Sequence, residues 1–276
     1  KLNWSYISPE IFGSMFQSVM NPKERRNLGA HYTSETNILR VIKPLFLDEL
    51  WKEFQSVKSS KNKLQVFHDK IASLKFLDPA CGCGNFLIIT YRELRLLELE
   101  IIQTLLFTHQ KLRRDVAVEA NINIGQIVKL NFNQFYGIEY EEFPAKIAEI
   151  SMYLIDHQMN MLLQKEFGQY IPSIPLKKGA SIIHGDSLEI NWQSLLNPEN
   201  TYDIIAKHTN IYLFEEPENE YKTVNIKTES FQVHKGIKPK EKKIIKFDYI
   251  IGNPPFIGSK VMSQYQRNQI VKQFDN

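Results

Sequence analysis

Residues 75–86 read KFLDPACGCGNF, and this stretch decides the fold class. A short apolar run ends at Asp78, glycines follow at Gly82 and Gly84, and apolar residues at helical spacing resume after Asn85. Glycines allow a sharp turn and a close approach of the backbone to a ligand, and the helix N-terminus behind such a turn favours anions. The stretch therefore predicts a strand, a ligand-binding turn and a helix, although a plain strand-to-helix turn would use similar residues.

Three later stretches repeat this order of an apolar run followed by a polar or Gly/Pro turn. The expected strands, each with the turn that follows it, are 134–138 before Glu139, 181–184 before Gly185-Asp186, and 247–251 before Gly252-Asn253-Pro254-Pro255-Phe256. A helix is expected from about Pro144 to Gln164. Alternating strands and helices predict an α/β fold, and open α/β sheets bind ligands beyond the carboxyl ends of their strands. The four turns should therefore meet in one crevice.

The first 74 residues are expected to form a helical segment, and residues 75–276 a partial catalytic domain. Ser8-Pro9 begins one apolar stripe at helical spacing, and Ser34 can cap a second helix whose stripe runs from Ile38 to Phe54. A polar loop, Lys23 to Thr33, separates the two helices.

Two stretches interrupt the expected alternation of strands and helices. Residues 108–133 make the first crossover unusually long, and residues 197–246 read as an insertion before the last expected strand. Within the insertion, β-branched and aromatic residues from Tyr221 to Val233 suggest a short hairpin, and a charged loop is an equal alternative.

Composition excludes several classes of protein. The chain has 276 residues, 43% of them hydrophobic, and 34 Lys plus Arg against 31 Asp plus Glu give a formal charge of only +3. Gross disorder is excluded, and nucleic acid could be held only by clustered basic groups. No apolar stretch is long enough for a bilayer span and the sole cysteines are Cys81 and Cys83, so we expect a cytoplasmic protein without disulfides. The scattered histidines predict no metal site.

The string DPACGCGNF at residues 78–86 resembles the S-adenosylmethionine loop of adenine-N6 DNA methyltransferases from bacterial restriction-modification systems, and NPPF at residues 253–256 matches their catalytic tetrapeptide. The loop precedes the tetrapeptide and GAHYTS stands at residues 29–34, which looks like the gamma order of motifs. Cys83 departs from the family, where serine is more frequent, and should be tolerated. The resemblance implies a class I methyltransferase: a Rossmann-like, mostly parallel sheet with an amino-terminal helical region and an insertion before the catalytic strand.

The resemblance also implies which residues contact the cofactor. The loop after the first strand would hold the methionine part, Glu139 the ribose hydroxyls, and Asp186 the adenine amine. The full implied set is Tyr32, Thr33, Asp78, Pro79, Ala80, Cys81, Gly82, Gly84, Asn85, Phe86, Glu139, Tyr140, Asp186, Ser187 and Leu188. Three members of this set also have a purely structural interpretation. Thr33 can help cap a helix, Glu139 can be a solvated group, and Asp186 can close its strand in an Asx turn.

The tetrapeptide Asn253-Pro254-Pro255-Phe256, by the same resemblance, is catalytic. The amine of adenine is a poor nucleophile because its lone pair is delocalised into the ring, so a catalyst needs acceptors for the N–H protons. The Asn253 side-chain oxygen and the Pro254 carbonyl supply two acceptors, prolines add no competing donor, and Phe256 offers a face for a stacked base. A rigid turn after a strand is the structural alternative.

Double-stranded DNA is the implied partner, with the target adenine flipped out of the helix. Candidate phosphate contacts are Lys23, Arg25, Arg26, the group Lys111 to Arg114 and the run Lys235 to Lys246, although charge runs are more often solvated. Rival functions are methylation of RNA or of protein glutamine, and cofactor binding without turnover. Because a complete methyltransferase sheet would need about three more strands, we expect a fragment whose target-recognition region lies elsewhere.

Overall fold

The computed structural model describes residues 33–109, 124–168, 181–196, 246–255 and 262–274. The expected helix at 8–19, the hairpin at 221–233, and the rest of the insertion over 197–245 lie outside these residues. The described elements, in chain order, are α3 (Glu35–Ile42), η2 (Lys43–Leu47), α4 (Asp48–Val57), α5 (Lys61–Ser73), β1 (Phe76–Asp78), α6 (Asn85–Gln103), η3 (Thr104–His109), α8 (Ile124–Ile127), η4 (Phe132–Gln134), β2 (Phe135–Glu139), α9 (Glu142–Phe167), β3 (Ser181–His184), η5 (Trp192–Leu196), β4 (Tyr249–Ile250) and α11 (Gln264–Phe274).

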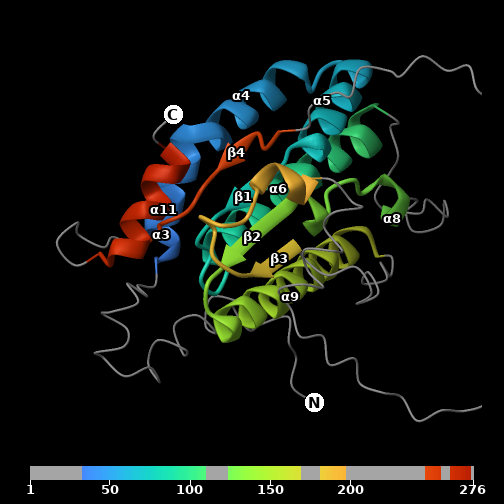
Figure 1. Cartoon of the computed structure of the whole chain (residues 1–276). Coiled ribbons are helices and arrows are strands. Elements are labelled where there is room, and N and C mark those ends of the chain that lie inside the picture. Colours follow the sequence, from blue (N-terminus) through green and yellow to red (C-terminus); the bar gives the residue numbers. More distant parts are fainter. Residues whose placement is uncertain (1–32, 110–123, 169–180, 197–245, 256–261, 275–276) are drawn as a thin grey trace, which may run out of the picture.

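The four strands form one parallel sheet in the order β3-β2-β1-β4 (Figure 1). The prediction of an α/β fold with a parallel sheet and helices before it is confirmed. Parallel neighbours place all four carboxyl ends on one edge, so the four predicted turns share that edge.

Element boundaries differ from the expectations by a few residues. β2 includes Glu139 as its last residue, α9 is longer than the predicted helix at both ends, and β4 is confined to Tyr249–Ile250. The last strand is short because only Tyr249 and Ile250 pair regularly with β1, although Ile251 still donates from its backbone N–H to the Leu77 carbonyl at 2.8 Å.

The predicted helix over Ile38 to Phe54 forms, but a π-helical segment, η2, interrupts it. Pro44 lies in this segment, and a proline inside a helix removes one N–H donor and crowds the preceding turn, which local widening of the helix relieves. Ser34 occupies the N-cap position, but its side chain makes no capping hydrogen bond; its backbone carbonyl instead accepts from Asn37 and Ile38.

The two faces of the sheet bury alternate residues of each strand, as the period of two requires. On one face Phe76 stacks on Phe135 of β2 and on Tyr249 of β4, with ring centroids 5.0 and 5.3 Å apart. These rings join a large core formed with α3 to α6 and α9. On the other face, Leu77, Tyr136 and Ile138 pack against Ile183 and the residues around η5. The sheet is thus covered on both sides.

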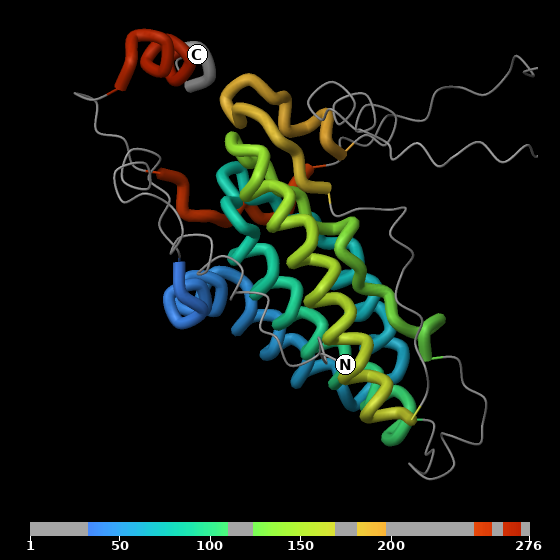
Figure 2. Tube along the Cα trace, turned by 90° about the horizontal axis from the view of Figure 1, so that it is seen from below, coloured from blue at the N-terminus to red at the C-terminus, as the bar shows by residue number. Residues whose placement is uncertain are grey.

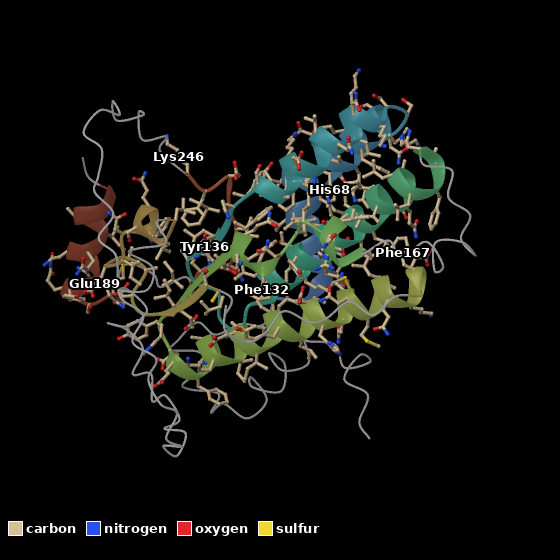
Figure 3. All side chains as sticks on the ribbon, turned by 90° about the vertical axis from the view of Figure 1, so that its right-hand side faces the viewer. His68, Phe132, Tyr136, Phe167, Glu189 and Lys246 are labelled. Carbon is tan, nitrogen blue, oxygen red and sulfur yellow. The ribbon has the colours of Figure 1, made fainter. Side chains whose placement is uncertain are left out.

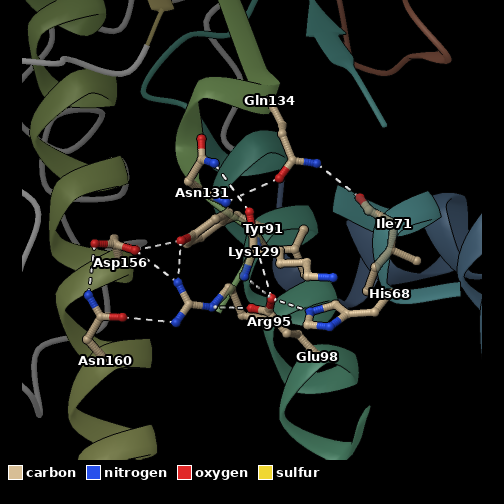
Figure 4. A network of polar contacts seen from close by, with 11 residues as sticks. His68, Ile71, Tyr91, Arg95, Glu98, Lys129, Asn131, Gln134, Asp156 and Asn160 are labelled. Atoms are coloured by element: carbon tan, nitrogen blue, oxygen red, sulfur yellow. Dashed lines mark hydrogen bonds and ion pairs between the residues drawn. The ribbon is translucent and has the colours of Figure 1, made fainter. Parts of the chain in front are cut away.

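Helices α6 and α9 run side by side across the sheet (Figure 2). A buried polar network holds them together away from the carboxyl edge of the strands (Figure 4). Arg95 donates to Tyr91, Asp156 and Asn160, and lies 3.3 Å from Glu98. Glu98 in turn contacts His68 of α5 at 2.8 Å and accepts from the backbone N–H groups of Lys129 and Leu130. The buried guanidinium group of Arg95 therefore lies beside the carboxylates of Asp156 and Glu98, and such pairing offsets the cost of burying a charge.

No helix among the described residues is long and apolar enough to cross a membrane.

Candidate functional site

The turn after β1 reaches the turn after β4 at the carboxyl edge of the sheet. β1 pairs with both β2 and β4, so Asp78 ends the central strand between them. A Cβ added at Gly252 would overlap Asp78 Oδ1 and lie 3.0 Å from Asp78 Cγ. Only a glycine therefore lets the backbone before Asn253 lie directly against the Asp78 carboxyl group. The sequence places these two residues far apart, and the sheet makes them neighbours.

The turn from Asp78 to Gly84 is held by backbone hydrogen bonds, one to β2 and one within the turn. Cys81 donates from its N–H to the Ile138 carbonyl at 2.9 Å, and Gly84 donates to the Cys81 carbonyl at 2.8 Å. Gly84 has φ +86° and stands at the N-cap of α6, where a Cβ would come within 3.0 Å of Ala148 Cβ on α9. Glycine is needed there for both its backbone conformation and the close helix approach. The turn is thus fixed against both β2 and α9 by close contacts of its backbone.

Asp78 is a buried carboxyl group without a positive partner among the described residues. Its side chain is 1% exposed, and Oδ1 accepts one hydrogen bond, from the Ala80 N–H at 3.1 Å. Burial raises the pKa of Asp78 to about 7, against the lowering effect of that hydrogen bond. A cationic group bound beside it would restore the charged form, so the residue fits the ammonium group of an amino-acid ligand.

Glu139 closes the neighbouring strand and connects two of the turns. Its Oε2 accepts from the Gly82 N–H at 2.8 Å and its Oε1 from the Glu141 N–H at 2.9 Å, while its backbone carbonyl accepts from Gly185 after β3. Burial raises its pKa, partly offset by the hydrogen bonds from Glu141 and Gly82. Each carboxylate oxygen has two lone pairs, so the group can still accept from ribose hydroxyls. Next to it, Tyr140 is 66% exposed.

Asp186 forms an Asx turn after β3, which is the structural alternative predicted for this residue from the sequence. Asp186 Oδ1 accepts from the Leu188 N–H at 2.9 Å, and its carbonyl accepts from Glu189 and Ile190. Trp192 donates from Nε1 to the Ser187 carbonyl at 2.7 Å. This turn is therefore rigid, and the second carboxylate oxygen of Asp186 is the one left to meet a ligand amine.

The described part of the tetrapeptide lies exposed at the end of β4. Asn253, Pro254 and Pro255 are all exposed, and Asn253 Nδ2 donates to Thr33 Oγ1 at 3.2 Å. The predicted amino-terminal contact thus lies beside the NPPF corner. Because its amide nitrogen is used in this way, Asn253 keeps its side-chain oxygen as the acceptor for a substrate. Tyr32 and Phe256 lie outside the described residues.

Some predicted loop residues contribute backbone or packing. Cys81 and Phe86 are 6% and 5% exposed and belong to the core, and Pro79 and Ala80 form the bend next to Asp78. Asn85, the first residue of α6, has a buried Oδ1 without a hydrogen-bond partner among the described residues. Such an atom costs free energy unless a ligand satisfies it, so Asn85 fits a binding site.

Burial sets the protonation state of the two cysteines in the loop after β1. Burial raises the pKa of Cys83 to about 12 and that of Cys81 well above its ordinary value, so both thiols are neutral near pH 7. Among the residues that the structure describes, no three His, Cys, Asp or Glu side chains form a group that could hold a metal ion.

Sequence reasoning did not single out the contact between Asp78 and Gly252. It also missed the hydrogen bond from Tyr265 of α11 to Glu189 in the turn after β3. The glycine before NPPF was a usable signal for the first, since a glycine in a strand often marks a close approach. Nothing in the sequence indicated the second. Of the basic residues proposed to touch DNA, the structure describes only Lys246, which is exposed.

The family model described as "MmeI, DNA-methyltransferase domain" matches residues 54–276. The chain is 32% identical over 274 residues to DNA methyltransferase A of Bacillus subtilis (strain 168), which covers 99% of this chain and 25% of that protein. It is also similar to the solved type IIL restriction-modification enzyme MmeI in complex with DNA, with 43% identity, a TM-score of 0.72, and coverage of 100% of this chain and 29% of that one. The chain thus spans between a quarter and a third of these relatives.

Proposed function

The chain belongs to the family of MmeI-type DNA-methyltransferase domains, and on that basis we propose that it transfers the methyl group of S-adenosylmethionine to the N6 amine of an adenine in DNA, as part of a restriction-modification or phage-defence system. One observation carries the proposal. The buried Asp78 carboxyl group lies against Gly252, which supports the proposal that the predicted cofactor loop and the NPPF corner belong to one site. A methyl donor at the loop would face an amine held at the corner.

S-adenosylmethionine, when bound, supplies a methyl group activated by a positively charged sulfur. Asp78 would pair with the ammonium group of its methionine part, and Asn85 Oδ1 offers a further buried acceptor nearby. Glu139 would accept from the ribose hydroxyls and Asp186 from the adenine amine. Tyr140, exposed beside Glu139, offers a ring face to the same adenine. The residues present therefore fit this cofactor.

Asn253 and Pro254 would prepare the amine for attack. Acceptance of two N–H bonds, by Asn253 Oδ1 and the Pro254 carbonyl, draws the protons out of the plane of the base and localises the lone pair on nitrogen. Thr33 holds the Asn253 amide in the orientation that presents Oδ1. Positioning of amine and methyl group in line would supply much of the rate, because the reaction becomes effectively unimolecular.

The amine lies inside the stack in duplex DNA, so the target base must be extruded to reach the corner. Phe256 is proposed as the stacking partner of this base. The DNA phosphates would be held by the basic residues proposed from the sequence, which are Lys23, Arg25, Arg26, the group Lys111 to Arg114 and the run Lys235 to Lys246.

The test compares Asn253→Ala with Asn133→Ala, in the protein at its full natural length. Asn133 is exposed in η4, directly before β2, at the opposite edge of the sheet. Transfer of tritiated methyl groups to unmethylated DNA, RNA and protein is measured, followed by nucleoside analysis of the DNA. We expect N6-methyladenine from the control and at least about a hundredfold less from Asn253→Ala, with cofactor affinity retained. A methylated base other than N6-methyladenine, or normal turnover by Asn253→Ala, would refute the proposal.

A further inference from the structure

Helix α11 begins nine residues after Pro255 and presents two polar side chains on one face. Tyr265 and Gln269 are four residues apart, which is one helical turn, and Gln269 Nε2 donates to the Tyr265 hydroxyl oxygen at 2.9 Å. Both side chains also meet Glu189 Oε1: Tyr265 donates its hydroxyl hydrogen, and Gln269 donates from Nε2 at 3.3 Å. One carboxylate oxygen thus binds two residues of α11, and Figure 3 shows Glu189 lying next to this helix.

Glu189 belongs to the rigid turn after β3. Its backbone N–H donates to the Asp186 carbonyl at 3.0 Å, and the next residue, Ile190, is buried in the core of the second face. The Glu189 side chain, in contrast, is exposed. The framework of the sheet therefore fixes the backbone of Glu189, while its carboxylate remains available to α11.

The NPPF corner accordingly lies between two anchors. Before it, Ile251 is buried and hydrogen-bonded to Leu77 of the central strand. After it, α11 is held by Glu189. A segment fixed at both ends has fewer conformations than one fixed at a single end, so the second anchor lowers the entropy that must be lost when Asn253 adopts its reactive position.

We propose that Glu189 is a positioning residue for methyl transfer, which holds Tyr265 and Gln269 and thereby fixes the NPPF corner relative to the turn that would bind the cofactor adenine. This inference rests on the proposed function. Glu189 would touch neither cofactor nor substrate, and it acts through its contacts with α11. The contact is exposed, so it adjusts the rate rather than deciding whether the fold forms.

The hydrogen bond from Tyr265 to Glu189 has the phenol as its donor. Acceptance by the Glu189 carboxylate raises the pKa of Tyr265, with a smaller lowering effect from Gln269. Tyr265 therefore stays protonated near neutral pH and remains the donor in this contact. The change from Tyr265 to Phe removes the donor and retains the ring.

The first test measures whether the anchor exists, without cofactor or DNA. Amide hydrogen exchange of peptides from residues 262–274 is compared for the wild type, Tyr265→Phe, Glu189→Ala, the double variant and the control Val271→Thr. The control changes an exposed side chain of the same helix and leaves the helix propensity nearly unchanged. We expect faster exchange in both single variants, no further increase in the double variant, and wild-type exchange in the control. Wild-type exchange in Tyr265→Phe and Glu189→Ala would overturn the inference whatever the function of the chain.

The second test measures what the anchor does, in the protein at its full natural length. We expect each single variant to lower kcat for methyl transfer about three- to tenfold, with KM for S-adenosylmethionine within about twofold of wild type. The double variant should lose no more than Glu189→Ala alone, because Glu189→Ala already removes the contact with Tyr265. Effects that multiply, or an unchanged kcat, would overturn the positioning role alone if Asn253→Ala is inactive. An active Asn253→Ala would instead overturn the proposed function, and the role of Glu189 with it.

Discussion

Cofactor affinity should rise steeply between pH 6 and pH 7, because binding needs the charged form of a buried carboxyl group. Asp78 has 1% of its surface exposed and no cationic partner among the described residues, and burial raises its pKa to about 7. The ammonium group of S-adenosylmethionine would pair with the carboxylate and not with the neutral acid. Binding must therefore expel the proton from that fraction of Asp78 that carries one.

The magnitude follows from the pKa. With a value of about 7, Asp78 is about one tenth ionised at pH 6 and about one half ionised at pH 7. The association constant is proportional to the ionised fraction, so it should increase about fivefold over this interval. Binding at pH 7 should release about half a proton. The interval ends at pH 7 because an α-amino group itself begins to lose its proton above this pH.

Isothermal titration of the full-length protein with S-adenosylmethionine, in two buffers of different ionisation enthalpy, measures both quantities. Asp78→Asn provides the control: it keeps the acceptor for the Ala80 N–H and cannot titrate. Its affinity should be lower than that of the wild type at pH 7 and should not change with pH. A wild-type affinity that is equal at pH 6 and pH 7, with no proton released, would refute the assignment of Asp78 to the ammonium group.

Three further outcomes are expected. Gly252→Ala should cost about 1–3 kcal/mol of stability and weaken cofactor binding, because the new Cβ overlaps the Asp78 carboxyl group; a thermal midpoint and affinity equal to wild type would contradict this. Without cofactor, Asp78→Asn should be more stable than wild type in urea unfolding, because the raised pKa of Asp78 makes its ionisation in the folded state unfavourable. The difference in unfolding free energy should grow from pH 4 to pH 7 toward about 4 kcal/mol, and a pH-independent difference would disprove it. Arg95→Met should cost about 3–5 kcal/mol by leaving the buried Asp156 and Glu98 without their positive partner, and a loss below about 1 kcal/mol in the same assay would count against that pairing.

The order of strands and turns could be predicted because its signals are local. Phe76-Leu77 followed by Asp78 and two glycines marks a strand, a turn and a helix within a dozen residues, and the structure has all three. The interruption of the predicted helix after Ile42 also has a local cause, Pro44, but its outcome as a π-helical segment depends on how the helix packs. The strand before NPPF was predicted too long because apolar residues alone do not tell where pairing ends.

The sequence by itself determined which chemical groups the chain carries. These are an acidic residue at or just after the carboxyl end of three strands, a glycine-rich loop and an Asn-Pro-Pro-Phe corner. Only the tertiary structure decided which of these groups meet. Parallel pairing of β1 with β4 brings Asp78 against Gly252, and Asn253 reaches Thr33 across a separation of 220 residues. The same packing removes water from Asp78 and so raises its pKa. Contacts between distant segments and the desolvation of a charge are properties of the folded chain, and no local pattern of residues encodes either.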